Sequence, residues 1–321
     1  MSEAIDKYRD TLATIGQLAE QAVDGSETVP GDGLEYAVDG PSCTMHSLPP
    51  RLLAKAAEFA AAINPLNAPV LGAAVGATAH LLTPEHLTLL TSKYWGSQPR
   101  QLTVAFLEAT PQDLKTRILQ HMNAWSQRIG ISFVLTSGAA DVHISRGAGG
   151  YWSYLGTDIR LIPANRPTMN LQGFTMNTPE NEYKRVVRHE TGHTLGFPHE
   201  HMRAALVAKI DPQKAYPYFL QRYGWSKTMV DQQVLTPLSQ GSFMGTPADQ
   251  DSIMCYQLPG SITRDGRPIR GGLDINASDY QFASEVYPPA GSAPSDTSKG
   301  ATAETSVDWD ESEDVTNPNL T

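Results

Sequence analysis

Three histidines and a glutamate are spaced so that together they can hold and use a metal ion. The chain reads His189-Glu190-Thr191-Gly192-His193, which places two histidines four residues apart. On a helix, residues four apart project side by side, so both imidazoles can bind one metal ion. Neutral imidazole nitrogens suit Zn²⁺. Glu190 flanks the pair, and from there its carboxylate can reach a metal-bound water.

His199 is the candidate third ligand, but it cannot belong to the same helix. If the helix continued, His199 would lie about 240° around the axis from His193, on the wrong face. Gly196 permits the positive φ that ends a helix, and Pro198 prevents its continuation. The resulting turn can return His199 to the metal. Three protein ligands leave one position for water and substrate, which is typical of a catalytic zinc site.

The complete pattern from His189 to His199, His-Glu-x-x-His-x-x-Gly-x-x-His, resembles the signature of the metzincin metallopeptidases. Within that group it is most similar to the astacins, because Glu200 and Arg203 continue the motif in the astacin manner. The segment 252–256, Ser-Ile-Met-Cys-Tyr, resembles the astacin methionine turn, although cysteine replaces the histidine of that turn. The chain is therefore similar to an astacin-like family, and a bacterial branch fits its departures from the animal members.

This resemblance covers about residues 93–288 and implies a fold and further site residues. The fold would be α+β, a metzincin-type zincin domain with a twisted mixed sheet, a backing helix and an active-site helix, plus a helical N-terminal region. Met254 would form an apolar floor beneath the ligands. Tyr256 would bind the resting metal or stabilise the oxyanion, with a buried structural tyrosine as the alternative. Substrate would add an antiparallel strand near Thr157 to Pro163.

Residue patterns independently predict a sheet backed by helices. Alternation of apolar and polar residues predicts strands or extended chain at 102–106, 131–135, 141–145, 151–155 and 159–162. Spacings of three and four residues predict helices from Thr110 to Ile129 and from Tyr183 to Leu195, and the resemblance adds a closing helix from Asp274 to Tyr287. The order strand, helix, strands, helix is typical of α/β or α+β domains.

Residues 1–92 are expected to form a helical region that is a candidate propeptide. Helical spacing of apolar residues is seen at 1–24 and 50–63, with a linker rich in Gly, Pro and acidic residues between them. Astacins are often held latent by an aspartate on the zinc, and some relatives use a cysteine, so Asp39 and Cys43 are candidates. Plain linker residues are the alternative for both.

Composition restricts the partners and leaves the localisation open. The net charge is −10, and residues 290–321 contain seven acidic residues and one basic residue, so we expect a disordered acidic tail there. The remainder lacks the basic excess of a nucleic-acid-binding protein. No apolar run is long enough to predict a membrane span. No signal peptide is visible, which favours a cytoplasmic protein or export by a non-classical route. Cys43 and Cys255 are expected to be free thiols.

Together these features predict a zinc endopeptidase whose catalytic domain spans 93–289. One Zn²⁺ would lie on the three histidines, Glu190 would act as general base, and the substrate would be a protein or peptide. Two alternatives remain open. One is a toxin or effector peptidase specific for a single protein target. The other is an inactive metzincin acting as a binding module, which would predict damage to Glu190 or to a ligand, and the sequence shows none.

Overall fold

The computed structural model describes residues 43–68, 92–237 and 247–291. The chain divides into two compact units, 1–290 and 291–321, so nearly all of the described residues belong to the first unit. The helix predicted at 1–24, Asp39 and most of the acidic tail lie outside the described residues. Within the described parts, no helix is long and apolar enough to cross a lipid bilayer.

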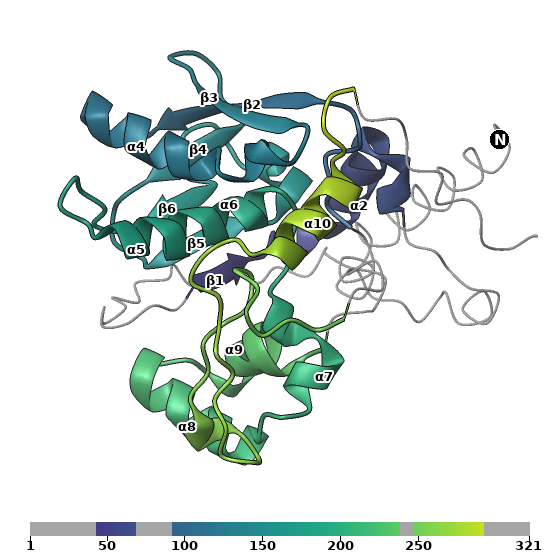
Figure 1. Ribbon diagram of the computed structural model, residues 1–321, viewed down its shortest axis with the longest axis vertical. Helices are drawn as coiled ribbons and strands as arrows, with labels where there is room; N and C mark the ends of the chain where they lie inside the picture. Colours follow the sequence, from purple (N-terminus) through teal and green to yellow (C-terminus); the bar gives the residue numbers. More distant parts are fainter. Residues whose placement is uncertain (1–42, 69–91, 238–246, 292–321) are drawn as a thin grey trace, which may run out of the picture. The chain divides into compact units, whose positions relative to one another are not determined.

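A six-stranded mixed sheet forms the centre of the first unit, in the order β1-β5-β6-β4-β2-β3. Only the β5–β6 pair is antiparallel, and the other neighbours are parallel. The strands are β1 (Cys43–His46), β2 (Arg100–Phe106), β3 (Ile131–Leu135), β4 (Val142–Ser145), β5 (Tyr151–Tyr154) and β6 (Met169–Leu171). The sheet and its helices confirm the predicted α+β class (Figure 1).

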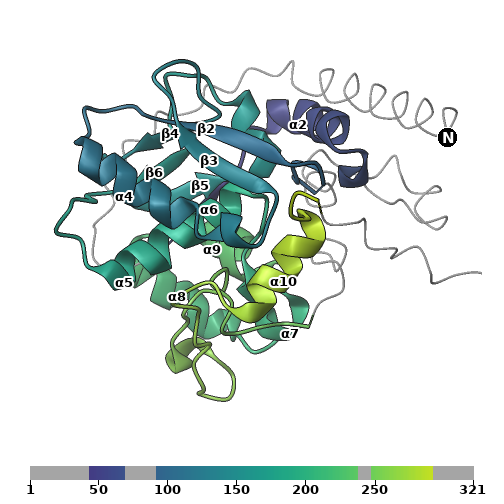
Figure 2. The ribbon, with the colours of Figure 1, turned by 45° about the horizontal axis from the view of Figure 1, so that its top comes forward.

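Two helices pack on strands of this sheet, and Figure 2 shows their arrangement from a second angle. The first, α4 (Gln112–Met122), packs on β3, and its buried residues are Leu114, Ile118, His121 and Met122. The predicted continuation to Ile129 is wrong, because α4 ends at Met122 and Trp125 reaches the core from a short 3₁₀ helix, Trp125–Gln127. The second, α6 (Arg188–Thr194), packs on β5 and follows α5 (Glu180–Glu182) and a π-helical turn, Tyr183–Val187.

The predicted extended chain at 159–162 is instead a 3₁₀ helix, Gly156–Leu161. Gly156 has φ +46°, and a Cβ there would lie 1.9 Å from the Lys93 carbonyl oxygen, so the chain can make this turn only with glycine. Asp158 is buried beside Lys93, with carboxylate and ammonium 3.2 Å apart. The expectation that substrate would pair near Thr157 to Pro163 is therefore wrong, because that segment is not a strand.

The helices that follow the histidine motif pack around a second apolar core. It includes Leu206, Phe219, Trp225, Val230 and Cys255. The helices are α7 (Ala204–Val207), α8 (Pro212–Tyr223) and α9 (Lys227–Val230), followed by a π-helical turn, Asp231–Leu235. The predicted closing helix is α10 (Ala277–Val286), which begins at a capping box made by Asn276 and Asp279.

The described part of the N-terminal region packs into the same unit. As predicted, α2 (Pro50–Ile63) ends at Asn64. Its buried residues pack on Leu161 and Ile162 of the 3₁₀ helix and its end. After α2, Asn67 joins the N-terminal region to the chain at Tyr94. Its side chain donates to the Tyr94 carbonyl at 2.8 Å and accepts from the Tyr94 amide at 2.9 Å.

Candidate metal centre

The helix α6 carries His189, Glu190 and His193, and all three side chains are buried. Gly192 separates the two histidines where the helix passes over Met254. A Cβ on Gly192 would lie 2.3 Å from the Met254 sulfur, so the close approach depends on this glycine. Met254 belongs to the main apolar core and lies beneath the helix, in the position that the sequence comparison expected for a floor.

Hydrogen bonds to the backbone orient the imidazoles of α6. His189 donates through Nδ1 to the Ile253 carbonyl at 2.6 Å, and His193 donates through Nδ1 to the Phe197 carbonyl at 2.8 Å. Carbonyl oxygens can only accept, so both Nδ1 atoms carry the proton and both Nε2 atoms present a lone pair to the site. Outer hydrogen bonds of this kind are what set the tautomer of metal-binding histidines.

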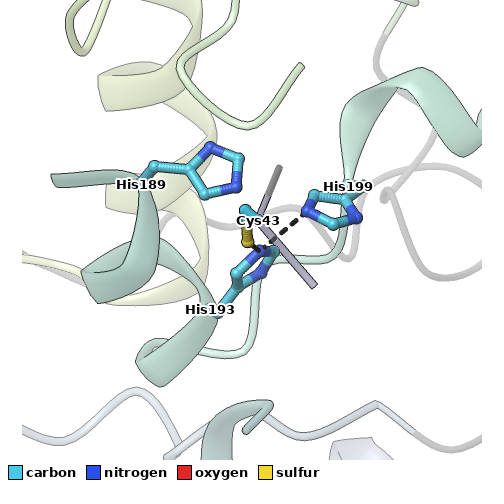
Figure 3. Close-up of side chains that lie close together, drawn as sticks. All are labelled: Cys43, His189, His193 and His199. Carbon is cyan, nitrogen blue, oxygen red and sulfur yellow. Dashed lines mark hydrogen bonds between the residues drawn. The ribbon is translucent and has the colours of Figure 1, made fainter. Parts of the chain in front are cut away.

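The chain then turns back, as the glycine and proline of the motif predicted. The helix has its C-cap at Leu195, and Gly196 takes φ +95°. The amide of Phe197 donates to the Gly192 carbonyl at 2.9 Å, which closes the turn. His199 thereby returns to the site, with its Nε2 only 3.0 Å from Nε2 of His193 (Figure 3).

Cys43 brings a fourth donor atom from β1, 150 residues away in sequence from His193. Its sulfur lies 3.3 Å from Nε2 of His193. One donor atom from each of Cys43, His189, His193 and His199 can be chosen so that all four lie within 4.8 Å of one another, and all four residues are buried. Figure 3 shows the three rings and the thiol converging on one point. The sequence named Cys43 only as one of two candidates for covering the metal.

The chemistry of these donors fits a zinc ion. Nε2 of His189 is buried and has no hydrogen-bond partner among the described residues. A buried nitrogen lone pair without a donor is costly, and a cation at the point of convergence would satisfy it. Three imidazoles and a thiolate form a donor set typical of tetrahedral Zn²⁺.

Burial also lowers the pKa values of the three histidines, which keeps their rings neutral and able to bind a cation. It lowers the pKa of His189 to about 4 and holds the pKa values of His193 and His199 well below their ordinary value. These rings are therefore unprotonated at neutral pH. Burial and the neighbouring Glu190 raise the pKa of the Cys43 thiol, so this group keeps its proton until a cation replaces it.

Glu190 and Tyr256 both present polar atoms that lack a well-formed hydrogen bond in the described structure. The two carboxylate oxygens of Glu190 and the Tyr256 hydroxyl are buried there without a well-formed hydrogen bond, and the Cys43 thiol interacts with both groups. Burial raises the pKa of Glu190 to about 8, against the opposing effects of Cys43 and Arg185. The Tyr256 ring packs on His199 with centroids 4.5 Å apart. Buried unsatisfied oxygens beside a metal site are typical of groups that act on a bound water or substrate.

A cavity of about 470 Å³ opens onto these groups. Its wall includes Tyr151 of β5, Arg185, Glu190 and Tyr256. The guanidinium of Arg185 forms a fork on Glu182, through Nε at 3.0 Å and Nη2 at 2.8 Å. The cavity is wide enough for substrate side chains next to the metal site.

Asp279 supports the site and was not singled out from the sequence. Its carboxylate accepts from the Ser252 hydroxyl at 2.6 Å and from the Ile253 amide at 2.9 Å. Ile253 in turn accepts the hydrogen bond from His189. The capping pattern Asn276-x-x-Asp279 was visible in the sequence, but nothing local indicated that the cap also holds the methionine turn.

Comparison with known proteins agrees with this geometry. The family model described as Astacin, a peptidase family, matches residues 89–264. Zinc metalloproteinase nas-27 of Caenorhabditis elegans is 31% identical over 94 residues, which cover 29% of this chain and 20% of that protein. The solved structure titled "Structure of myroilysin" is similar with 31% identity and a TM-score of 0.57, over 61% of this chain and 96% of that chain.

The fold and the site define a metallopeptidase of the metzincin class with a histidine-rich zinc site. This chain belongs to the astacin family of peptidases. The aligned stretch spans only a fifth of the length of the curated relative from C. elegans. Membership of a bacterial branch and the domain limits at 92 and 289 stay predictions.

Proposed function

We propose that this chain is a zinc-dependent endopeptidase acting on protein or peptide substrates. The observation that carries the proposal is the convergence of His189, His193 and His199 beside the buried Glu190. Among the described residues, the carboxylate oxygens of Glu190 have no well-formed hydrogen bond. One zinc ion on these three imidazoles would polarise the scissile carbonyl and acidify a bound water. The cysteine at the same point is the one donor that must leave for water and substrate to enter.

Glu190 is the proposed general base. Burial raises the pKa of its carboxyl to about 8, which makes the carboxylate a stronger base. A cation on the neighbouring histidines would favour the ionised form, which can accept a proton from water and pass it to the leaving amine. The Tyr256 hydroxyl is the proposed donor to the oxyanion, because it is buried, lines the same cavity and has no well-formed hydrogen bond among the described residues.

The strand β5 is the proposed platform for substrate. It lies beside α6, and without β1 it would be the edge of the sheet. An edge strand presents free N–H and C=O groups that bind an extended peptide by strand addition. The proposed substrate-binding strand is therefore Tyr151–Tyr154, in place of the segment from Thr157 to Pro163 that was expected from the sequence.

The N-terminal region is proposed to keep the enzyme latent. Cys43 supplies a donor to the zinc site, and the three residues after it occupy the edge of β5. The two functions of the cleft, metal coordination and peptide pairing, are thus both blocked by one four-residue strand. Displacement of this strand would open the site, and Asp39 is not needed for the proposal.

Two measurements on the full chain carrying Cys43→Ala, which lacks the thiol proposed to cover the metal, test the proposed function. Zinc stoichiometry by atomic absorption should be one per chain, and casein hydrolysis should require that zinc and be lost with a chelator. Hydrolysis that survives complete removal of zinc would contradict the proposal. A peptide library then separates a broad endopeptidase from a toxin or effector specific for one protein, because only the second would leave both casein and most of the library intact.

A further inference from the structure

Gln233 holds the main chain of β1 from the side opposite β5. Its side-chain oxygen accepts from the Met45 amide at 3.2 Å, and its side-chain nitrogen donates to the Met45 carbonyl at 3.1 Å. On the other side, β1 pairs with β5, and Met45 lies opposite Ser153 in the register of that ladder. The occupant of the cleft is therefore held between a strand and a single carboxamide.

Both hydrogen bonds of the Gln233 side chain are made to the main chain of Met45. In an extended chain the N–H and C=O of one residue point to the same side, and alternate residues point to opposite sides. A carboxamide carries a donor and an acceptor side by side, so it can bond both groups of one residue as a neighbouring strand would. Nothing in the contact depends on the Met45 side chain.

We propose that Gln233 clamps the main chain of any extended peptide in this cleft and so positions the substrate as well as β1. This rests on the proposed peptidase function. A substrate running antiparallel to β5 has the opposite direction to β1, which exchanges the places of its N–H and C=O. Turning the carboxamide by half a rotation exchanges its oxygen and nitrogen in the same way, so Gln233 fits both directions.

The clamp has a fixed position relative to the metal site. The backbone carbonyl of Gln233 accepts a hydrogen bond from Nε2 of His201 at 2.9 Å. The His201 ring packs on His199 and Tyr256, with centroids 5.0 and 4.7 Å apart. A peptide bonded to Gln233 is thus registered against the zinc ligands through a chain of buried contacts.

The first test uses the zinc-loaded full chain and the labelling rate of the Cys43 thiol by a disulfide reagent. The variant Gln233→Met removes both hydrogen bonds at similar volume, and Gln232→Met, on the exposed side of the same turn, is the matched control. We expect labelling of Cys43 about three- to tenfold faster in Gln233→Met than in the control, as for the loss of one or two hydrogen bonds. Equal rates would overturn the clamp on β1.

The second test compares amide and ester substrates of one sequence in the full chain carrying Cys43→Ala. Each ester replaces one backbone N–H of the peptide by oxygen, and the ratio of kcat/KM for amide over ester is measured. If β1 competes with substrate for the cleft, it lowers kcat/KM for the amide and for the ester by the same factor, so its effect cancels in the ratio. We expect one ester position to lower kcat/KM about three- to tenfold with Gln233 present and to have no effect in Gln233→Met.

Positions that pair with β5 provide the internal control, because their ester effect should persist in both variants. If every ester effect is the same in Gln233→Met and Gln232→Met, Gln233 does not bind substrate. A second substitution, Gln233→Glu, keeps the acceptor and removes the donor, so it should retain the ester effect. Absence of any hydrolysis would contradict the proposed function, whereas the labelling rates still decide for or against the clamp.

Discussion

The Cys43 sulfur lies 3.3 Å from Nε2 of His193, although the two residues are 150 positions apart. A thiol at this place occupies the coordination position that a catalytic zinc site keeps open for water. Because Cys43 is also the first residue of β1, the contact joins the sheet edge to the metal site, and under the proposed latency both would be covered together.

Removing the thiol should therefore activate the full chain. We expect Cys43→Ala to raise hydrolysis of a fluorogenic peptide about tenfold or more, because each loss of about 1.4 kcal/mol from the covering contact changes its occupancy tenfold. Cys255→Ala, the other buried free cysteine, should give no such rise. Equal activity of Cys43→Ala and the unaltered chain would show that the thiol does not control the site.

Zinc affinity should depend on pH through the thiol more than through the histidines. Burial lowers the histidine pKa values, to about 4 for His189, so these ligands lose no proton on binding zinc near pH 7. The pKa of Cys43 is raised, so thiolate formation on zinc releases a proton, and proton release makes binding tighter as pH rises. Calorimetry in buffers of different ionisation enthalpy should show about one more proton released by the unaltered chain than by Cys43→Ala. Equal release would exclude Cys43 as a ligand.

Glu190 and His199 should separate catalysis from metal binding. In the Cys43→Ala background we expect Glu190→Gln to lower kcat by about a hundredfold or more, with zinc content unchanged, because the substitution removes only the base. His199→Ala should lose activity and zinc together. Retention of full kcat by Glu190→Gln would end the assignment of Glu190 as base.

Asp279 should stabilise both the fold and the metal site. Asp279→Ala leaves the Ile253 amide and the Ser252 hydroxyl buried without an acceptor, so we expect a loss of about 2–3 kcal/mol in the free energy of unfolding. Because Ile253 also orients His189, zinc affinity should fall about tenfold. Glu285→Ala, at an exposed position of α10, is the matched control in denaturant titrations. A normal zinc affinity in folded Asp279→Ala would disconnect the cap from the metal.

Gly156 and Gly150 allow a steric effect to be separated from a conformational one. Both have positive φ, but only at Gly156 would an added Cβ meet another atom, the Lys93 carbonyl. We expect Gly156→Ala to cost about 3 kcal/mol or more and Gly150→Ala only about 1 kcal/mol. The difference in thermal unfolding checks this, and equal costs would place the effect in backbone conformation alone.

The parts of the site that follow local rules were predictable from the sequence. His189 and His193 share a helical turn, and Gly196 ends the helix, so their position on one face follows from local rules, although the ring of His189 is oriented by the distant Ile253. Cys43 reaches the site through the pairing of β1 with β5, which joins segments about 110 residues apart. Gln233 reaches it from a separate turn, where its backbone carbonyl accepts a hydrogen bond from His201. No local pattern encodes such a pairing, so the sequence could name Cys43 but not place it, and it offered no signal for Gln233.

The failed strand at 159–162 has a related cause. Ile159 and Leu161 are spaced as on one face of a strand, whereas Ile159 and Ile162 are spaced as on one face of a 3₁₀ helix, so local apolar spacing does not distinguish the two structures. The choice is made by Lys93, whose carbonyl and side chain approach Gly156 and Asp158 from another part of the chain. Likewise, Trp125 was placed on a helix because its apolar character fits the spacing, whereas the core receives it from a separate turn.

The paired hydrogen bonds between Asn67 and Tyr94 bear on how activation would proceed. If the N-terminal region inhibits as proposed, a single cut between residues 68 and 92 would produce two chains that remain associated through these bonds, through α2 and through β1. Inhibition would then become an equilibrium between bound and free peptide. After the cut, dilution would favour dissociation of the N-terminal peptide, and concentration would favour its rebinding. The cleaved protein would therefore be inactive at high concentration and active at low concentration.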